Sequence, residues 1–293
     1  MPEAGSYSAP PSPSIRQPLL RIPELHQAEL VKRPGHVPYF TFPSIEASGV
    51  AFCAFSTRLG GVSGAPFDSL NLGVTTRDGA DNVRENRQRF SRALGYKLRE
   101  FIRLEHGCQV HVLREARAEH DAFLPVADAV ITRLRGVPIT IYYADCVPVL
   151  LVDPITPAVG LVHAGWRGTV NEVVARTVEA MEAAFGSDPG RLLAGLGSSI
   201  GPCCMQVDED VATVVREAFP QWQESIVGPF NKGTGKSMID LWELNCLQLV
   251  RAGVPRRNVA NSRLCTACRK DLFFSYRRDR RETGRLAMLV SLH

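Results

Sequence analysis

The sequence predicts an α+β fold in which mixed β-sheets pack against helices. Short apolar runs, typical of buried strands, occur in succession as well as between segments with helical spacing. Strands and helices therefore do not alternate strictly, as a doubly wound parallel sheet would require. With 293 residues, 45% of them hydrophobic and 22% charged, the chain has the length of one large domain and the composition of a soluble globular protein.

The N-terminal half is predicted to consist mainly of strands. Its first residues are rich in Pro and Ser, and we expect residues 1–40 to form a mobile extension, with a helix near 22–31, before a single domain over 41–293. Strands are expected over 37–42, 50–55, 104–113, 128–132 and 137–142. One helix over 81–94 interrupts them, with Asp81 as its N-cap and Gly95 just past its end.

The centre of the chain predicts a strand, a turn and a return strand. Apolar residues fill 147–152 and 159–162, and the turn formers Asp153-Pro-Ile-Thr-Pro157 separate them. If the strands pair antiparallel, Cys146 and His163 come to the same end of the sheet. Glycines and Arg167 then lead into a helix over 170–185, for which Thr169-x-x-Glu172 has the spacing of a capping box. The N–H groups at such a helix start, beside Arg167, would bind an anion.

The C-terminal part is predicted to contain two strands and two helices. The strands are expected over 192–196 and 286–290, and the helices over 208–219 and 240–252, the second with a capping box from Asp240 to Glu243. A Cys265-x-x-Cys268 pair lies between them. A zinc ribbon needs a second such pair, and Cys203-Cys204 has the wrong spacing, so we interpret these cysteines as structural residues.

Three residues are the strongest candidates for chemistry: His111, Cys146 and His163. Two histidines and a cysteine are a known catalytic zinc composition, which leaves the fourth position open. A rival interpretation uses no metal, with Cys146 as a thiolate nucleophile and His163 as its base. Asp145 could orient the histidine, although a sequence neighbour of Cys146 is expected to point elsewhere. Arg58, in an Arg-x-Gly-Gly segment, offers a second anion site.

Composition argues against several classes of protein and excludes one. A net charge of +4 does not indicate nucleic-acid binding, and no apolar run reaches the length of a membrane span. The N-terminus lacks the pattern of a signal peptide, so we expect a cytoplasmic protein, and a monomer. A conventional laccase needs about ten copper-binding histidines in His-x-His pairs. The chain has 7 histidines and no His-x-His, which excludes that class.

A set of motifs, in order along the chain, resembles the YfiH/LACC1 family. They are Phe55-Ser-Thr-Arg-x-Gly-Gly, Ser69-Leu-Asn-Leu-Gly, Gln109-Val-His, Ala144-Asp-Cys-x-Pro, His163-Ala-Gly-Trp-Arg-Gly, Gly201-Pro-Cys-Cys and Phe273-Phe-Ser-Tyr-Arg-Arg-Asp. This family was once called polyphenol oxidase or laccase and is now usually labelled purine nucleoside phosphorylase. The matches run from about Phe40 to the C-terminus.

The resemblance implies a fold similar to the catalytic domain of cytotoxic necrotizing factor. It also implies zinc bound by His111, Cys146 and His163. The implied activities are phosphorolysis of adenosine, inosine, guanosine and methylthioadenosine to base and ribose-1-phosphate, and deamination of adenosine. Some bacterial members are instead assigned as peptidoglycan editing factors, amidohydrolases that remove a mis-incorporated serine from a UDP-muramoyl precursor.

Two positions depart from the family pattern. The family usually has Gly after the histidine of Gln-Val-His, where this chain has Val112, and it has Thr where this chain has Tyr143. We therefore expect a zinc-dependent nucleoside enzyme in which Arg58 and Arg167 hold phosphate, since the guanidinium fork matches its oxygens. The amidohydrolase is the second hypothesis, and a non-catalytic binding module is the third.

Overall fold

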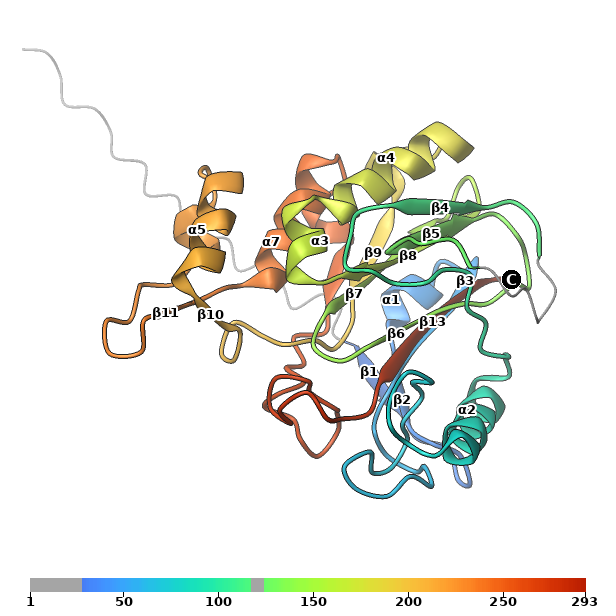
Figure 1. The fold of residues 1–293 in the computed structure, drawn as a ribbon. Helices are drawn as coiled ribbons and strands as arrows, with labels where there is room; N and C mark the ends of the chain where they lie inside the picture. The colour runs from blue at the N-terminus through green and yellow to red at the C-terminus, as the bar shows by residue number, and fades with distance from the viewer. Residues whose placement is uncertain (1–27, 117–123) are drawn as a thin grey trace, which may run out of the picture.

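A computed structural model of the chain describes residues 28–116 and 124–293 and confirms the α+β class (Figure 1). Its largest sheet has six strands in the order β12-β9-β7-β8-β5-β4. These are β12 (Val259–Asn261), β9 (Leu193–Leu196), β7 (Val147–Asp153), β8 (Ala158–Ala164), β5 (Ala129–Thr132) and β4 (Val110–Leu113). The pairs β12–β9 and β4–β5 are parallel and the others antiparallel, so the sheet is mixed, as predicted.

A second sheet is antiparallel throughout, with strands in the order β1-β2-β3-β13-β6. They are β1 (Glu29–Val31), β2 (Tyr39–Thr41), β3 (Ala51–Ser56), β13 (Leu286–Leu292) and β6 (Ile139–Tyr143). The short strands β10 (Gln206–Asp208) and β11 (Lys236–Met238) form a separate antiparallel pair. The helices are α1 (Pro43–Glu46), α2 (Ala80–Leu94), α3 (Trp166–Val170), α4 (Val173–Phe185), α5 (Glu209–Ala218), α6 (Gln223–Ile226) and α7 (Leu241–Arg251), with short 3₁₀ turns at Pro189–Arg191 and Arg256–Asn258.

The two large sheets pack face to face between helices. Alternate residues of β7 point to opposite faces. Val149 and Leu151 join the core under α4 and α7, whereas Leu150 and Val152 join the core between the two sheets. The outer face of the five-stranded sheet packs against α2 in a third cluster. Figure 1 shows these layers, with α3 and α4 above the six-stranded sheet and α2 below the other one.

The central hairpin forms as predicted. β7 and β8 pair antiparallel, and His163 lies opposite Pro148, so Cys146 and His163 do come to one end of the sheet. The prediction of a capping box at Thr169-x-x-Glu172 was wrong. Glu172 adopts a left-handed conformation, with φ of 61°, and this breaks the expected helix into α3 and α4. The short helix α3 therefore begins directly after Gly165.

Other boundaries differ in smaller ways. The N-cap of α2 is Gly79 rather than Asp81, while the Asp240 side chain does cap α7 by accepting the Glu243 N–H at 2.9 Å. Residues 1–27 of the expected extension, and most of the helix expected near 22–31, lie outside the described residues. From Glu29 the chain pairs into the five-stranded sheet. Within the described residues, no helix has the length and hydrophobicity to cross a membrane.

Candidate active site

One end of the β7–β8 hairpin carries a cluster of three possible metal ligands. Among the described residues, ligand atoms of His106, Cys146 and His163 all lie within 4.8 Å of one another. Cys146 directly precedes β7, His163 lies in β8, and His106 comes from the loop before β4. The rings of His106 and His163 meet edge to face, with centroids 4.9 Å apart. His163 is buried, Cys146 is half-buried and His106 is exposed, so the cluster is open on the His106 side.

A buried carboxylate positions both histidines. Asp128 Oδ1 lies 2.9 Å from Nδ1 of His163, and the same carboxylate accepts the N–H groups of His106 at 2.9 Å and of Gly107 at 2.7 Å. Although burial raises the pKa of Asp128, its bonds to His163 and to the Gly107 N–H outweigh that effect and hold the pKa low. A carboxylate on the second ring nitrogen is typical of metal-binding histidines, and it leaves Nε2 of His163 for the cluster.

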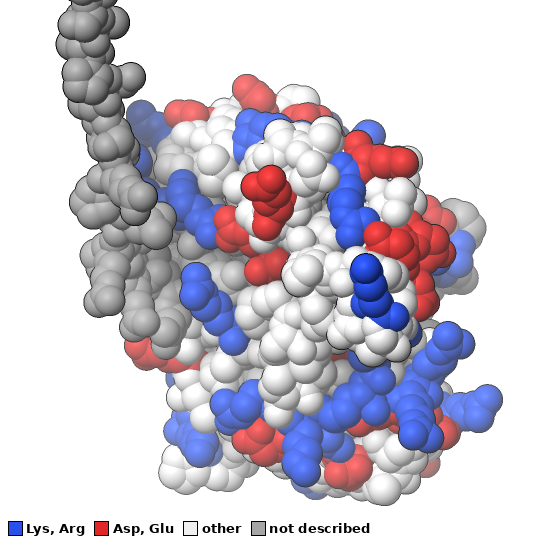
Figure 2. Space-filling view, turned by 90° about the vertical axis from the view of Figure 1, so that its left-hand side faces the viewer, with Lys and Arg blue, Asp and Glu red and all other residues white. Residues whose placement is uncertain are grey.

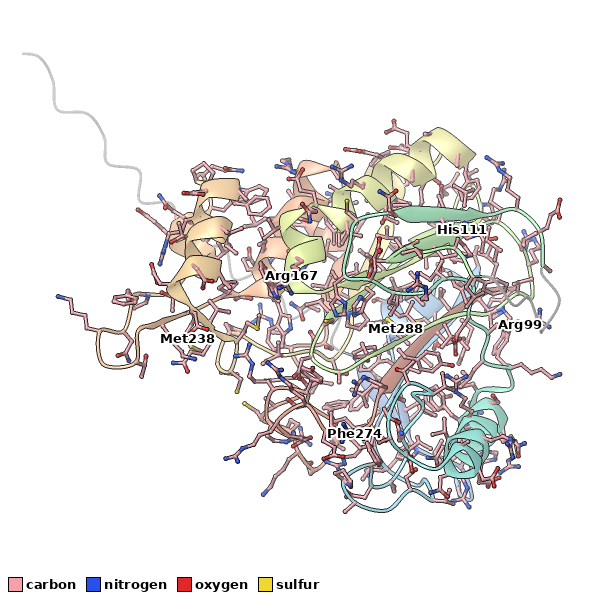
Figure 3. The ribbon with its side chains drawn as sticks, in the orientation of Figure 1. Arg99, His111, Arg167, Met238, Phe274 and Met288 are labelled. Atoms are coloured by element: carbon pink, nitrogen blue, oxygen red, sulfur yellow. The ribbon has the colours of Figure 1, made fainter. Side chains whose placement is uncertain are left out.

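His111 is not part of this cluster. It lies in β4, where it is in register with Val130 of β5 (Figure 3). The structure thus brings together Cys146 and His163 of the expected ligand set. The second histidine of the cluster is His106 instead of His111. A signal for His106 was present in the sequence. His106 is followed by Gly107, the residue that the family motif has after its histidine, whereas His111 is followed by Val112.

The cluster favours a thiolate beside a charged imidazole when it holds no metal. Burial opposes ionisation of Cys146, but the charge of His163 and the hydrogen bonds from His106 and His163 outweigh it and lower the pKa of the thiol to about 6. Burial likewise lowers the pKa of His163, while the Cys146 thiolate and Asp128 raise it to about 10. A cation is therefore favoured at this position, whether it is a proton on His163 or a metal ion.

Two glycines of the His-Ala-Gly-Trp-Arg-Gly segment are required by close packing around the cluster. A Cβ atom on Gly165 would lie 3.1 Å from both Cys146 Sγ and His106 Cδ2. A Cβ on Gly168 would lie 2.7 Å from the carbonyl oxygen of Gly107. The glycines therefore let the start of α3 approach the loop that carries His106.

Asp145 points away from the cluster, as expected. Its side chain accepts hydrogen bonds from Thr266 Oγ1 at 2.6 Å, Ser275 Oγ at 3.1 Å and the Arg277 N–H at 2.7 Å. Burial raises its pKa despite these bonds. With φ of 80°, Asp145 turns the chain sharply just before Cys146. It therefore anchors the C-terminal loops to the site and does not orient the histidine.

The cluster opens into a cavity of about 1320 Å³ that is rich in arginine. The arginines that line it are Arg87, Arg103, Arg167, Arg277, Arg280, Arg281 and Arg285. Trp166 and Tyr276 also line it, whereas Phe273 and Phe274 are buried in the core. Lys and Arg side chains also gather on the lower part of the face shown in Figure 2. The cavity is thus suited to an anionic ligand that carries an aromatic ring.

The two arginines expected to hold phosphate have different surroundings. Arg167, at the start of α3, lines the cavity, and its guanidinium lies over the Trp166 ring at 4.3 Å (Figure 3). Arg58 is not among the lining residues. It donates from Nε to the Asp68 carbonyl at 2.7 Å and pairs with the Asp68 carboxylate at 3.1 Å. Arg285, which is partly buried and lies in the cavity wall, was not singled out from the sequence.

The donor set fits a metal ion. A thiolate and two imidazoles are ligands that zinc accepts, and three protein ligands leave the fourth position free. His106 is exposed to the cavity side, so a ligand in the cavity can reach that position. The oxygen-rich set that magnesium or calcium prefers is missing from this cluster.

Comparisons with known proteins identify the family of the chain. Residues 52–293 match the family model described as multi-copper polyphenol oxidoreductase laccase. The chain is 34% identical over 252 residues to the purine nucleoside phosphorylase YlmD of Geobacillus stearothermophilus, covering 82% of this chain and 89% of that protein. It is 38% identical over 240 residues to the adenosine deaminase RL5 of an unknown prokaryotic organism, covering 79% and 90%.

Solved structures give the same result. The crystal structure of Bacillus licheniformis YfiH matches with a TM-score of 0.81 and 30% identity, covering 89% of this chain and 98% of that one. The structure of YlmD from G. stearothermophilus matches with a TM-score of 0.78, also at 30% identity, covering 92% and 100%. The resemblance seen in the motifs is confirmed, and the chain belongs to the YfiH/LACC1 family, whose model carries the multi-copper polyphenol oxidoreductase laccase description.

Proposed function

We propose that this protein is a zinc-dependent purine nucleoside phosphorylase that also deaminates adenosine. Its substrates would be adenosine, inosine, guanosine and methylthioadenosine, with phosphate as the second substrate and ribose-1-phosphate as a product. The observation that carries the proposal is the His106, Cys146 and His163 cluster at the wall of an arginine-lined cavity. The enzyme names of the relatives support the same class of reaction.

The proposed zinc ligands are His106, Cys146 and His163, so His106 replaces His111 in the set expected from the sequence. Zinc bound there would supply a Lewis acid, or a site that lowers the pKa of a bound water. With zinc bound, Asp128 would accept the proton of Nδ1 of His163 and so leave Nε2 as the nitrogen that can hold the ion. It also fixes the loop of His106 by accepting two N–H groups.

Arginines of the cavity are proposed to hold phosphate against the ribose. Arg167 is exposed and lines the cavity, and Arg285 is partly buried in its wall, so both can present a planar fork to phosphate oxygens. Arg58 is less suited than the sequence suggested because Asp68 already binds its guanidinium. Trp166 and Tyr276 are proposed to stack on the purine.

We also propose that the protein acts in the cytoplasm as a monomer. None of the 8 cysteines forms a disulfide, which suits a reducing compartment. Sedimentation of the purified protein at micromolar concentration tests this part of the proposal, and a stable dimer would contradict it.

The experiment is a product assay with and without phosphate. Purified protein is incubated with inosine or adenosine, and free base, ribose-1-phosphate, free ribose and inosine are separated. We expect phosphate-dependent base release with an equal amount of ribose-1-phosphate, and inosine from adenosine without phosphate. Alanine at His163 should abolish both activities, since it removes a ligand. Full activity in that variant would contradict the zinc-dependent mechanism.

The amidohydrolase remains the alternative, and the low pKa of the Cys146 thiol favours it. A thiolate next to a charged imidazole is the arrangement of a cysteine nucleophile. Metal-free protein that keeps its activity on a muramoyl-serine substrate, and loses it on thiol alkylation, would support this alternative. A protein that loses all activity on zinc removal and regains it with zinc would support the nucleoside enzyme.

A further inference from the structure

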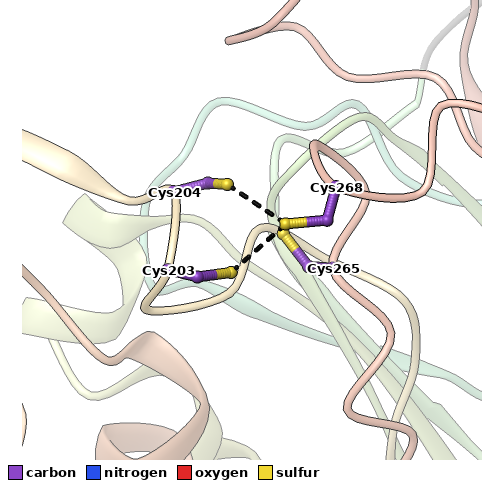
Figure 4. Close-up of side chains that lie close together, drawn as sticks. All are labelled: Cys203, Cys204, Cys265 and Cys268. Carbon is purple, nitrogen blue, oxygen red and sulfur yellow. Dashed lines mark hydrogen bonds between the residues drawn. The ribbon is translucent and has the colours of Figure 1, made fainter.

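A second cluster of metal-binding side chains lies outside the candidate active site. Cys203 and Cys204 come from the loop before β10, and Cys265 and Cys268 come from the turn after β12 (Figure 4). All four sulfur atoms lie within 4.8 Å of one another. Cys268 Sγ is 3.5 Å from Cys203 Sγ and 3.4 Å from Cys204 Sγ. The sequence does not reveal this site, because the two pairs lie far apart along the chain and the cysteines of the first pair are adjacent.

We propose that Cys203, Cys204, Cys265 and Cys268 bind a structural zinc ion, separate from the ion proposed at Cys146. Zinc binds thiolates at about 2.3 Å in tetrahedral geometry, which places the sulfurs about 3.8 Å apart. The sulfur separations of the cluster match this spacing. A four-cysteine set with no open position is typical of zinc sites that stabilise a fold and do not catalyse.

A disulfide explains the cluster less well. A disulfide joins two sulfurs at about 2.05 Å and uses only two cysteines. Here Cys268 lies at almost the same distance from Cys203 and Cys204, so the geometry selects neither as a disulfide partner. An iron–sulfur cluster is also a poor fit, because its four cysteines are divided between two or four iron atoms, so that not all of the sulfurs can lie as close together as around a single ion.

The close packing of the four sulfurs also favours a cation. Four thiolates within 4.8 Å of one another would repel, and a metal ion that replaces their protons removes that repulsion. The Gly201 N–H already points at Cys265 Sγ, at 3.3 Å, as a donor that would stabilise a bound thiolate.

The position of the site indicates what the ion would do. Thr266, between two of the cysteines, donates from its N–H to the Ser199 carbonyl and from its hydroxyl to the Asp145 carboxylate. The Ile200 N–H donates to the Asp145 carbonyl at 2.9 Å. An ion that joins the loop of Cys203 to the turn of Cys268 therefore cross-links the two segments that hold Asp145 next to Cys146. Zinc at this site would therefore stabilise the backbone around Asp145, next to the active-site residue Cys146.

The experiment measures zinc, copper and iron in purified wild-type protein and in three variants. We expect about two zinc ions per chain in the wild type, and one fewer in Cys268→Ser. Cys146→Ala should also lose one, from the other site. Cys246→Ala, which removes a buried cysteine that belongs to neither cluster, should retain both. Equal zinc in the wild type and Cys268→Ser would overturn the proposal, as would copper or iron in place of the second zinc.

Three further measurements keep the test decisive if Cys268→Ser fails to fold. Cys203→Ser changes an exposed residue of the same cluster and is expected to lose the same ion. Cobalt added to metal-free Cys146→Ala protein should give strong thiolate charge-transfer absorption, which the double variant with Cys203→Ser should lack. Denatured, chelator-treated wild type should titrate as 8 free thiols. Two fewer thiols would reveal a disulfide and overturn the zinc site, without bearing on the nucleoside assay.

Discussion

Asp128 Oδ1 lies 2.9 Å from His163 Nδ1, and the same side chain accepts the backbone N–H groups of His106 and Gly107. One buried carboxylate thus fixes the ring of one proposed ligand and the backbone of the other. His106 adopts a left-handed conformation, with φ of 64°, and the bond from its N–H helps to hold it there. The two histidines are therefore positioned together.

We predict that Asp128→Asn weakens zinc binding at the Cys146 site by roughly 10- to 100-fold, because an amide is a weaker partner for His163 than a carboxylate. Competition with a chromophoric chelator measures the affinity. Asp153→Asn is the matched control, since Asp153 is also buried but accepts N–H groups in the turn after β7. Equal zinc affinity in Asp128→Asn and the wild type would contradict the role of Asp128.

Gly165→Ala should disturb the cluster directly. The new Cβ would lie 3.1 Å from both Cys146 Sγ and His106 Cδ2, closer than ordinary contacts allow. We expect zinc affinity and turnover to fall together while circular dichroism shows a folded protein. Gly64→Ala is the control, because a Cβ at Gly64 meets no atom within 4 Å. If Gly165→Ala turns over at the wild-type rate, the close packing around the ligands has no functional role.

In the metal-free protein Cys146 should alkylate as a thiolate. His163 and His106 lower its pKa to about 6, so the thiolate predominates above that pH and is lost below it. The rate of iodoacetamide labelling of Cys146, followed by peptide mass spectrometry, should rise with a midpoint near pH 6, and zinc should suppress it. A midpoint near the ordinary cysteine value of about 8.5 would show that the histidines do not stabilise the thiolate.

Arg167→Ala should raise the KM for phosphate. A hydrogen bond to a charged group contributes about 1.5–3 kcal/mol, which corresponds to roughly a 10- to 150-fold loss in kcat/KM for phosphate. Arg58→Ala is the informative comparison. Its guanidinium binds Asp68 and lies over the Phe274 ring at 4.6 Å, so we expect a lower Tm and an unchanged KM for phosphate. A raised KM for phosphate in Arg58→Ala, with an unchanged KM in Arg167→Ala, would instead identify Arg58 as the phosphate ligand.

Local patterns predicted the central hairpin and several helices. The apolar runs of 147–152 and 159–162 and the turn formers between them placed β7 and β8, and their register brought Cys146 and His163 together. Because successive side chains of a strand point to opposite faces, those of β7 belong to two different cores. The break at Glu172 could not be predicted, because a left-handed glutamate has no local sequence signal.

Asp128 and the four cysteines depend on contacts between distant segments, whereas His106 had a local signal in the Gly107 that follows it. The strand pattern around His111 is real, and β4 forms there, but the ligand-like histidine lies five residues earlier in the preceding loop. Asp128 begins an apolar strand and carries no motif that connects it to His163, 35 residues away. The four-cysteine cluster likewise joins loops that are separated by about 60 residues, so only the fold brings its two halves together.

The comparison of His106→Ala with His111→Ala tests the central claim most directly. Zinc content and phosphate-dependent base release from inosine are measured for both variants beside the wild type. We predict that His106→Ala loses one zinc ion per chain and its turnover, while His111→Ala retains both. If His111→Ala loses zinc and turnover and His106→Ala retains them, the metal centre described here is wrong.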